Sequence, residues 1–494
     1  MHRFPVEILA HIFRLAVEGS YASGHVKDTW AALHVVCRRW YEVMIGQGTI
    51  ASDIRITDEH WDVEFATHLL EQSNPFAVHL TMVLHYTPRN AYTVVQLQEF
   101  LGTAMTYHCA RIQSMVVGQS GVHADLKELL LRAHLPDLRH LDIGPHLPIR
   151  VILCAEDLSL QAPELTTLRI ASCALLQPTP GKTHSIFPNV VKLELTGSPS
   201  PVDISDIPWD IASVIGRLPA LKILVLADYF PQTPRPTSQR PVELSHGLTK
   251  IEYQSSKPAS SVMELDALLL HATARRSVRL GWADPHTLVD VLSGAFSNVK
   301  QRWDPDKTLE ETENETTRTA WLATSIVVDR DEDIVDLRLR SSNSKATGIM
   351  DIQVRSAGDH LAYMVACIPS NAVRELHVQG VEPLRVLWRY MKHSTSLLDL
   401  HIIGRSAEGF ANTIEQDPKM FANLRHVFIG GRICQPGLVA TLSSLLSALA
   451  CRHTDGMTQL ETLAFPEGIS RQSLTLFEPF VNKVSNGAKE SVSA

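Results

Sequence analysis

The chain has 494 residues, of which 45% are hydrophobic and 20% are charged, and its formal net charge at pH 7 is -8. Single compact cores stop growing at roughly 250–300 residues, so this length requires several domains or an elongated repeat array. The composition excludes a largely disordered chain, and the acidic balance disfavours a general nucleic-acid-binding role, because such binding relies on an excess of Lys and Arg.

The cysteines and the N-terminus indicate the compartment. The chain has 7 cysteines, with no CxxC pair, which argues against a disulfide scaffold and against a zinc ribbon. Charged residues interrupt the first apolar stretch, so it does not resemble a signal peptide, and no run approaches the roughly 18 apolar residues of a membrane helix. We therefore expect a cytoplasmic and/or nuclear protein with no membrane partner and no nucleic-acid partner.

The first fifty residues carry the pattern of three short helices. Apolar side chains recur at helical spacing over residues 4–16, and Pro5 suits the first turn of a helix. A Gly- and Ser-rich stretch at 18–25 breaks this pattern. A second helix is expected from about Lys27, and a third one carries Trp40. Three helices of this length form a module that is too small to be very stable alone, and such modules often gain stability by docking on a partner.

Two blocks in this region, "FPVEILAHIF" and "VCRRW", resemble the F-box, in particular the version common in large fungal F-box families. The family opens with Leu-Pro-x-Glu-hydrophobic-Leu, continues with an Ile-Phe pair and later has Val-Cys-Arg-x-Trp. Phe4 replaces the usual first Leu, and Ile50 and Ala51 stand near the place of a usual Leu-Trp pair. The resemblance covers about one tenth of the chain. It implies that a Skp-family adaptor, and through it a cullin, binds here.

The residues expected to form or support this adaptor interface belong to the two blocks. They are Phe4, Pro5, Ile8, Leu9, Ile12, Phe13, Val36, Cys37 and Trp40. Some of them must also hold the three helices together, and the spacing alone does not divide the two roles.

A phrase of the form Leu-x-x-Leu-x-Ile/Leu recurs downstream. The clear copies begin at Leu135, Ala162, Phe187 and Leu218, and weaker copies begin at Gly247, Arg275, Asp333, Ala372, Ser396, Asn423 and Gln459. Aligning the second Leu of the clear copies gives Leu141, Leu168, Leu193 and Leu224, with spacings of 27, 25 and 31 residues. Leu376, Leu400 and Val427 align in the same way, with spacings of 24 and 27 residues. These periods are typical of leucine-rich repeats.

The repeats predict about ten short parallel strands, with the Leu and Ile side chains stacked inward and the alternate side chains pointing out along a concave face. Stretches with helical periodicity at 262–274 and 437–451 suit the convex side. The expected fold class is thus α/β, a three-helix F-box followed by an irregular leucine-rich-repeat solenoid, or horseshoe. F-box proteins commonly carry such a tail. The alternative, a doubly wound parallel sheet, needs longer apolar strands and a ligand fingerprint after the first one.

The expected domain organisation follows from these patterns and from two polar tracts. It comprises the F-box at 1–50, a linker with the first irregular or capping repeats at 51–130, leucine-rich repeats at 131–300, a polar charged insertion at 301–325, further repeats at 326–480 and a flexible tail at 481–494. A Pro-rich stretch at 229–244 reads as an exposed loop.

Catalytic motifs are not found in the sequence. It has no GxGxxG, HExxH or GxSxG, and the acidic run at 329–333 lacks the Gly and the terminal Glu of a calcium loop. The 23 histidines are scattered and read as surface or satisfied residues rather than ligands. We therefore expect a protein that is not an enzyme, with no cofactor and no metal site.

The function that these features imply is that of a substrate-recognition subunit, or adaptor, of a Skp–cullin–F-box ubiquitin ligase. A target protein of unknown identity is expected to bind the outward strand positions of the repeats, at Arg139, Asp142, Arg169, Lys192, Glu194 and Lys222. Later outward positions are Glu375, His377, Asp399, His401, Arg425 and His426. Two alternatives stay open: a non-degradative F-box scaffold and, more weakly, an enzyme on an α/β fold.

Overall fold

A computed structural model gives the structure of the chain. It describes residues 4–57, 62–83, 91–118, 130, 132–144, 152–171, 174–176, 186–197, 211–229, 242–243, 247–255, 269–270, 275–282, 323–329, 334–340, 350–357, 373–380, 384–391, 394–417, 419–430, 435–466 and 469–486. The chain divides into two compact units, both mixed α/β with largely parallel sheets. The N-terminal unit comprises Met1–Thr249 with Leu268–His271, and the C-terminal unit comprises Lys250–Ala267 with Ala272–Ala494.

Three helices open the N-terminal unit: α1 (Val6–Ser23), α2 (Val26–Val35) and α3 (Arg38–Gly46). Helix α1 ends at Gly24, whose φ of 82° lies in the left-handed region that favours glycine. Cys37 has an extended backbone and separates α2 from α3. Helices α1, α2 and α3 pack against one another in every pair, as the apolar spacing of the first fifty residues predicts.

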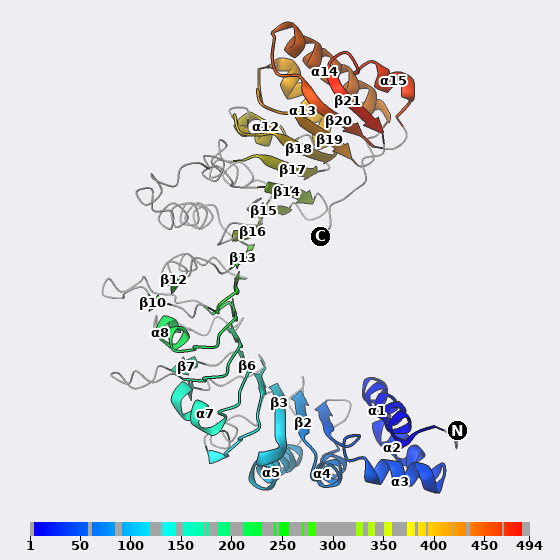
Figure 1. Cartoon of the computed structure of the whole chain (residues 1–494), viewed down its shortest axis with the longest axis vertical. Helices are drawn as coiled ribbons and strands as arrows, with labels where there is room; N and C mark the ends of the chain where they lie inside the picture. Colours follow the sequence, from blue (N-terminus) through cyan, green and yellow to red (C-terminus); the bar gives the residue numbers. More distant parts are fainter. Residues whose placement is uncertain are drawn as a thin grey trace. The chain divides into compact units, whose positions relative to one another are not determined.

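The main sheet of the N-terminal unit has the strand order β1-β2-β3-β4-β6-β8-β9, and each neighbouring pair is parallel. The bounds are β1 Asp53–Thr57, β2 Val78–Val83, β3 Ile112–Gly118, β4 His140–Ile143, β6 Thr167–Ala171, β8 Lys192–Thr196 and β9 Ile223–Ala227. The intervening helices are α4 Val63–Gln72, α5 Ala91–Tyr107, η1 Cys109–Arg111, α7 Ala155–Gln161 and α8 Ile211–Gly216. Helices α4 and α5 lie together beside β2 and β3 (Figure 1).

The alignment of the repeated phrase is confirmed by the strand register. Leu141, Leu168, Leu193 and Leu224 are direct partners across β4, β6, β8 and β9, and all four are buried. The same row extends upstream through Ile54, Leu80 and Met115 of β1, β2 and β3. The repeated strands thus begin within the segment 51–130. The Leu phrase does not reveal these strands, because Ile, Met and Val fill their inward positions in the row, except that of Leu80, and most of the neighbouring inward positions.

Two short parallel pairs accompany this sheet. Strand β5 (Ile152–Cys154) pairs with β7 (Ala174–Leu176), and β10 (Val242–Glu243) pairs with β12 (Leu269–Leu270). The prediction of a helix over 262–274 is therefore wrong at Leu269–Leu270, and the remainder of that stretch lies outside the described residues. Most of the predicted Pro-rich loop, residues 230–241, also lies outside them.

The sheet of the C-terminal unit has the order β11-β13-β16-β15-β14-β17-β18-β19-β20-β21. The bounds are β11 Lys250–Ser255, β13 Arg275–Trp282, β14 Ala323–Asp329, β15 Ile334–Arg340, β16 Met350–Ala357, β17 Glu375–Gly380, β18 Asp399–Gly404, β19 His426–Gly430, β20 Leu460–Phe465 and β21 Val481–Asn486. The helices are α12 Arg385–Met391, α13 Ser406–Gln416, α14 Gln435–Thr454 and α15 Arg471–Thr475. Helix α13 packs between α12 and α14 and against β18 (Figure 1).

Several expectations for this unit are confirmed or corrected. Leu376, Leu400 and Val427 are register partners, and α14 contains the predicted helix at 437–451. Strand β15, however, is antiparallel to β14 and β16, so the phrase beginning at Asp333 is not a parallel repeat strand. The first part of the expected flexible tail, Val481–Asn486, forms strand β21, which is parallel to β20, and residues 487–494 lie outside the described residues. Residues 301–322 of the expected insertion lie outside the described part, whereas 323–325 belong to β14.

A cluster of three buried aromatic side chains packs α12 against α13 in the C-terminal unit. The ring of Trp388 on α12 lies 5.3 Å from that of Phe410 on α13 and 6.5 Å from that of Phe421. All three side chains are essentially inaccessible to solvent. Where β17 and β18 end, Gly404 has a φ of +79°, and a Cβ there would stand 2.6 Å from the carbonyl oxygen of Gly380. Close strand packing therefore requires glycine at this position.

No helix in the described ranges has both the length and the apolar character needed to cross a membrane. The cysteines that the structure describes as free are Cys37, Cys109 and Cys451.

Candidate functional site

Helix α1 has two apolar faces with different environments. Leu9, Phe13 and Val17 are spaced by four residues, and their exposed fractions are 1%, 0% and 3%. The other face carries Ile8, Ile12 and Leu15, whose exposed fractions are 46%, 45% and 52%. The first face holds the three helices together, whereas the second one leaves large aliphatic side chains in contact with solvent.

Exposed apolar residues continue beyond α1. Phe4 precedes the helix and is held beside α3, because the Arg39 side chain donates a hydrogen bond to the Phe4 carbonyl oxygen. Val35 and Val36, at the junction of α2 and α3, are 81% and 54% exposed, and Tyr41 on α3 is exposed as well. We call the exposed residues Phe4, Ile8, Ile12, Leu15, Val35, Val36 and Tyr41 the N-terminal apolar surface. Single exposed apolar residues are ordinary, but several large ones on one helical face, as Ile8, Ile12 and Leu15 are on α1, are typical of an interaction site.

The structure divides the residues predicted to bind an adaptor. Phe4, Pro5, Ile8, Ile12 and Val36 are exposed, and Cys37 and Trp40 are half-buried. Leu9 and Phe13 are buried in the helical module, so of the two predicted roles they have the one of holding the three helices together. The Phe13 ring packs 4.7 Å from the Trp40 ring, which explains its burial. Leu15, Val35 and Tyr41 were not predicted, although Leu15 continues the helical spacing of Ile8 and Ile12.

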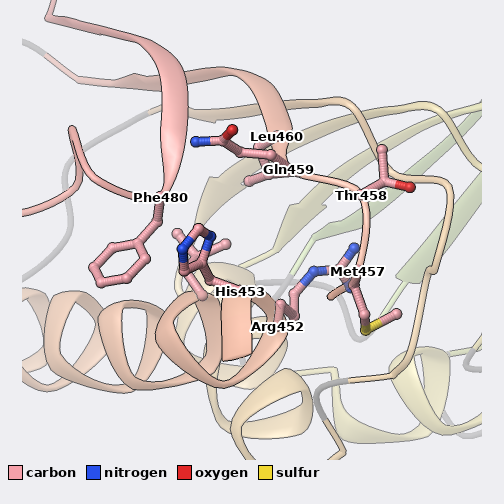
Figure 2. Close-up of a pocket in the computed structure, with 8 residues that line it drawn as sticks. Arg452, His453, Met457, Thr458, Gln459, Leu460 and Phe480 are labelled. Carbon is pink, nitrogen blue, oxygen red and sulfur yellow. The ribbon is translucent and has the colours of Figure 1, made fainter. Parts of the chain in front are cut away.

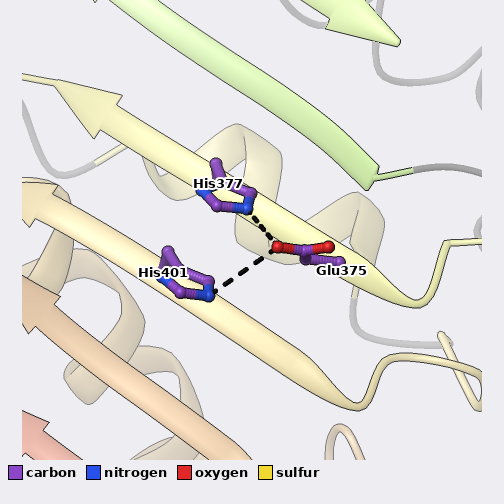
Figure 3. A group of neighbouring side chains, drawn as sticks. All are labelled: Glu375, His377 and His401. Atoms are coloured by element: carbon purple, nitrogen blue, oxygen red, sulfur yellow. Dashed lines mark hydrogen bonds and ion pairs between the residues drawn. The ribbon is translucent and has the colours of Figure 1, made fainter. Parts of the chain in front are cut away.

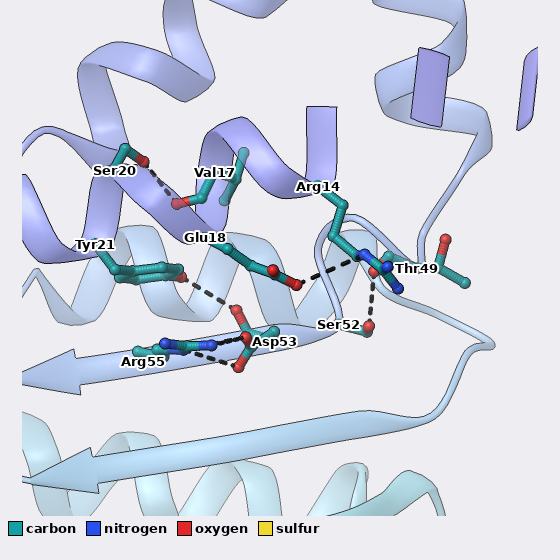
Figure 4. Close-up of polar contacts among 9 residues, drawn as sticks. All are labelled: Arg14, Val17, Glu18, Ser20, Tyr21, Thr49, Ser52, Asp53 and Arg55. Carbon is teal, nitrogen blue, oxygen red and sulfur yellow. Dashed lines mark hydrogen bonds and ion pairs between the residues drawn. The ribbon is translucent and has the colours of Figure 1, made fainter. Parts of the chain in front are cut away.

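The helical module is joined to the sheet by polar contacts (Figure 4). The Tyr21 hydroxyl on α1 donates to the carbonyl oxygen of Asp53 on β1, at 3.2 Å. The guanidinium of Arg55 forms an ion pair with Asp53 and lies 5.3 Å from the centre of the Tyr21 ring. Burial, the largest influence, raises the pKa of Tyr21 to about 12. Lys27 on α2 adds an ion pair to Asp62, which caps α4 by accepting from the Phe65 N–H.

A second polar feature follows one face of the N-terminal sheet. Register places Asp142, Arg169 and Glu194 side by side on β4, β6 and β8. Arg169 Nη1 lies 3.3 Å from Asp142 Oδ2, and Arg169 Nε lies 3.0 Å from Glu194 Oε1 without hydrogen-bond alignment. Lys192 Nζ lies 3.0 Å from Glu194 Oε2. We call Asp142, Arg169, Lys192 and Glu194 the charged row.

The charged row is only partly solvated. The exposed fractions of the Asp142 and Glu194 side chains are 14% and 18%, whereas those of Arg169 and Lys192 are 44% and 41%. Burial raises the pKa of Asp142 above its ordinary value, and the attraction of Arg169, which is shared with Glu194, does not offset it. The two carboxylates are therefore largely shielded from solvent, and the side chains of Arg169 and Lys192 are the parts of the charged row most accessible to a partner.

The other two predicted target-binding residues lie outside this row. Arg139 and Lys222 are exposed and come one position before β4 and β9. Register pairs Lys192 with Ile223, so Lys222 stands one position before the partner of Lys192, as Arg139 stands one position before His140. A difference of one position changes the face to which a strand residue points.

A small hollow in the C-terminal unit is lined by Arg452, His453 and Phe480, among others (Figure 2). Arg452 has a structural role here, because its guanidinium donates to the carbonyl oxygens of Met420 and Phe421, at 2.6 and 3.3 Å.

Comparison with protein-family models and with curated proteins finds no match to this chain.

Proposed function

We propose that the chain is the substrate-recognition subunit of a Skp–cullin–F-box ubiquitin ligase. The N-terminal apolar surface binds a Skp-family adaptor, and the repeated strands hold the target protein. The chain performs no bond chemistry in this account. It raises the effective concentration of a target lysine near a conjugating enzyme that the cullin recruits.

One observation carries the proposal: α1 buries one apolar face in its own module and leaves a second one exposed. A helix that serves only as core needs one apolar stripe. Ile8 and Ile12 of the second stripe fall within the block that resembles the opening of the F-box, and Leu15 follows two residues after it. The motif resemblance and the exposure are independent of each other, and both point to a helical partner-binding module.

The proposed fold is a three-helix F-box followed by an irregular leucine-rich-repeat solenoid. Its support is the row of inward residues from Ile54 to Leu224, which are aligned by parallel register at spacings typical of these repeats. In such arrays the outward strand positions are open to partners. The charged row occupies these positions, and its mixed charge suits a polar protein surface rather than a lipid. The proposed location is cytoplasmic and/or nuclear.

The test is co-purification of the full chain with a recombinant Skp-family adaptor, followed by addition of the matching cullin. We expect the chain and the adaptor to co-elute in size-exclusion chromatography and the cullin to join them. An adaptor that elutes separately from a folded chain contradicts the proposal. Binding of the adaptor without the cullin favours the alternative, a non-degradative scaffold.

A further inference from the structure

Three side chains with metal-binding chemistry lie together on the C-terminal sheet: Glu375 and His377 of β17 and His401 of β18 (Figure 3). Glu375 and His377 are two residues apart on one strand and thus share a face. Parallel register pairs His377 with His401, which places the second imidazole on the same face. The alternate residues Leu376 and Leu400 are buried on the opposite face. The sheet backbone therefore sets the relative positions of all three side chains.

The nitrogen atoms of both histidines face one carboxylate oxygen (Figure 3). His377 Nε2 lies 2.6 Å from Glu375 Oε1, and His401 Nε2 lies 3.8 Å from the same oxygen. The three potential ligand atoms all lie within 4.8 Å of one another. The exposed fractions of the three side chains are between 26% and 33%, so an ion and its water ligands have access from solvent.

Ring stacking holds the imidazoles in this orientation. The His377 and His401 rings are parallel to within 6°, with centroids 4.2 Å apart. Phe428 of β19 stacks on the other side of His401, at 4.3 Å. The stack places both Nε2 atoms beside Glu375, and because imidazole binds a metal ion in its own ring plane, the two rings must tilt toward each other when one ion binds both.

We propose that Glu375, His377 and His401 bind a divalent transition-metal ion of the zinc class. Two imidazoles and one carboxylate form a ligand set that proteins use for zinc with an open position, and imidazole disfavours Mg²⁺ and Ca²⁺. The ion takes the place of the proton between His377 and Glu375, and that proton moves to the other ring nitrogen of His377. Tetrahedral ligands at about 2.0–2.2 Å from zinc stand roughly 3.4 Å apart, so the site is completed by shifts of about 1 Å in the ligand atoms together with a tilt of the two imidazole rings toward the ion.

The same face offers a matched control in His426 of β19. Its Nε2 lies 3.9 Å from Asp399 Oδ1 and 3.6 Å from Glu461 Oε2, and its side chain is 30% exposed, as that of His401 is. His426 thus has carboxylate neighbours and similar accessibility, but no second imidazole belongs to its group among the described residues. A variant of His426 therefore distinguishes metal binding at the proposed site from general binding of metal by surface histidines.

The experiment is titration of the full-length, chelator-treated chain with Co²⁺, followed by visible spectroscopy and by displacement with Zn²⁺. We expect one ion to bind at this site, with a weakening in His377→Ala, His401→Ala and Glu375→Gln of at least the roughly 10- to 100-fold that loss of a mere outer-shell partner of a metal ligand costs. His426→Ala should bind as the wild type does. Circular dichroism verifies the fold, and Glu375→Gln keeps the test valid if a histidine variant unfolds.

Two results overturn the metal site. One is a wild-type chain that takes up no Co²⁺ or Zn²⁺, and the other is a His377→Ala/His401→Ala double variant with the wild-type number of ions and affinity. Neither result bears on adaptor binding, because the site and the N-terminal apolar surface lie in different units of the chain.

Discussion

The ring of Phe13 packs 4.7 Å from the ring of Trp40, at an interplanar angle of 55°. This contact joins α1 to α3 and connects the two sequence blocks that resemble the F-box. It lies on the buried side of α1, where Phe13 and Leu9 are inaccessible to solvent, while Ile8 and Ile12 are exposed on the other side.

Phe13→Ala should destabilise the helical module by about 3–5 kcal/mol, because it removes a fully buried ring and leaves a cavity. Ile8→Ala, on the exposed face of the same helix, should change stability by less than about 0.5 kcal/mol. Hydrogen exchange of α1 peptides, followed by mass spectrometry, measures both changes. Equal protection of α1 in the two variants would show that this packing is wrongly assigned.

The fold was predictable where the sequence pattern specifies a row of buried apolar residues across adjacent strands. Aligned leucines such as Leu141 and Leu168 identify strands and their register, because a one-residue shift would turn the apolar side chains to the opposite face. Strand direction is not encoded in this way, and β15 fits the same phrase although it runs antiparallel. Its direction depends on connections that a local pattern does not contain.

The sites were predictable only in part. Ile8 with Ile12 and Leu9 with Phe13 have the same helical spacing, and which pair is buried depends on the position of Trp40 in the folded module. The proximity of His377 and His401 follows from the alignment of Leu376 with Leu400. The stacking of these rings and their approach to Glu375 depend on side-chain packing, which the alignment does not give.

Tyr21 gives a prediction of pH dependence. Burial raises its pKa to about 12, above the ordinary value of about 10, so the folded state favours the neutral phenol. The resulting contribution to stability is fully present below pH 10 and is lost as pH rises from 10 through 12. Tyr21→Phe cannot ionise, so the alkaline loss of stability should be shallower in this variant. Urea unfolding between pH 8 and 11.5 measures the slope, and identical slopes for the variant and the wild type would contradict the burial of an un-ionised Tyr21.

The charged row gives a prediction about the target. Arg169→Gln/Lys192→Gln removes the two cationic groups that are most open to solvent, while the neighbouring carboxylates remain. Quantitative mass spectrometry of proteins that co-purify with the full chain should show loss of target proteins and unchanged recovery of the Skp-family adaptor. The control is Arg405→Gln, which breaks an ion pair of 3.2 Å with Glu408 on α13 instead. If the double variant and the control retain the same proteins, target recognition does not use the charged row.

The affinity of the purified chain for a Skp-family adaptor, measured by isothermal titration calorimetry, tests the central claim most directly. Ile8→Glu/Ile12→Glu places charges on the exposed face of α1 without touching the buried one. Since interface anchors contribute about 2 kcal/mol or more each, the account predicts a loss of affinity of at least about 30-fold. Leu160→Glu, at a 73% exposed position of α7, is the matched control and should bind as the wild type does. An Ile8→Glu/Ile12→Glu chain that binds the adaptor with wild-type affinity would contradict the account.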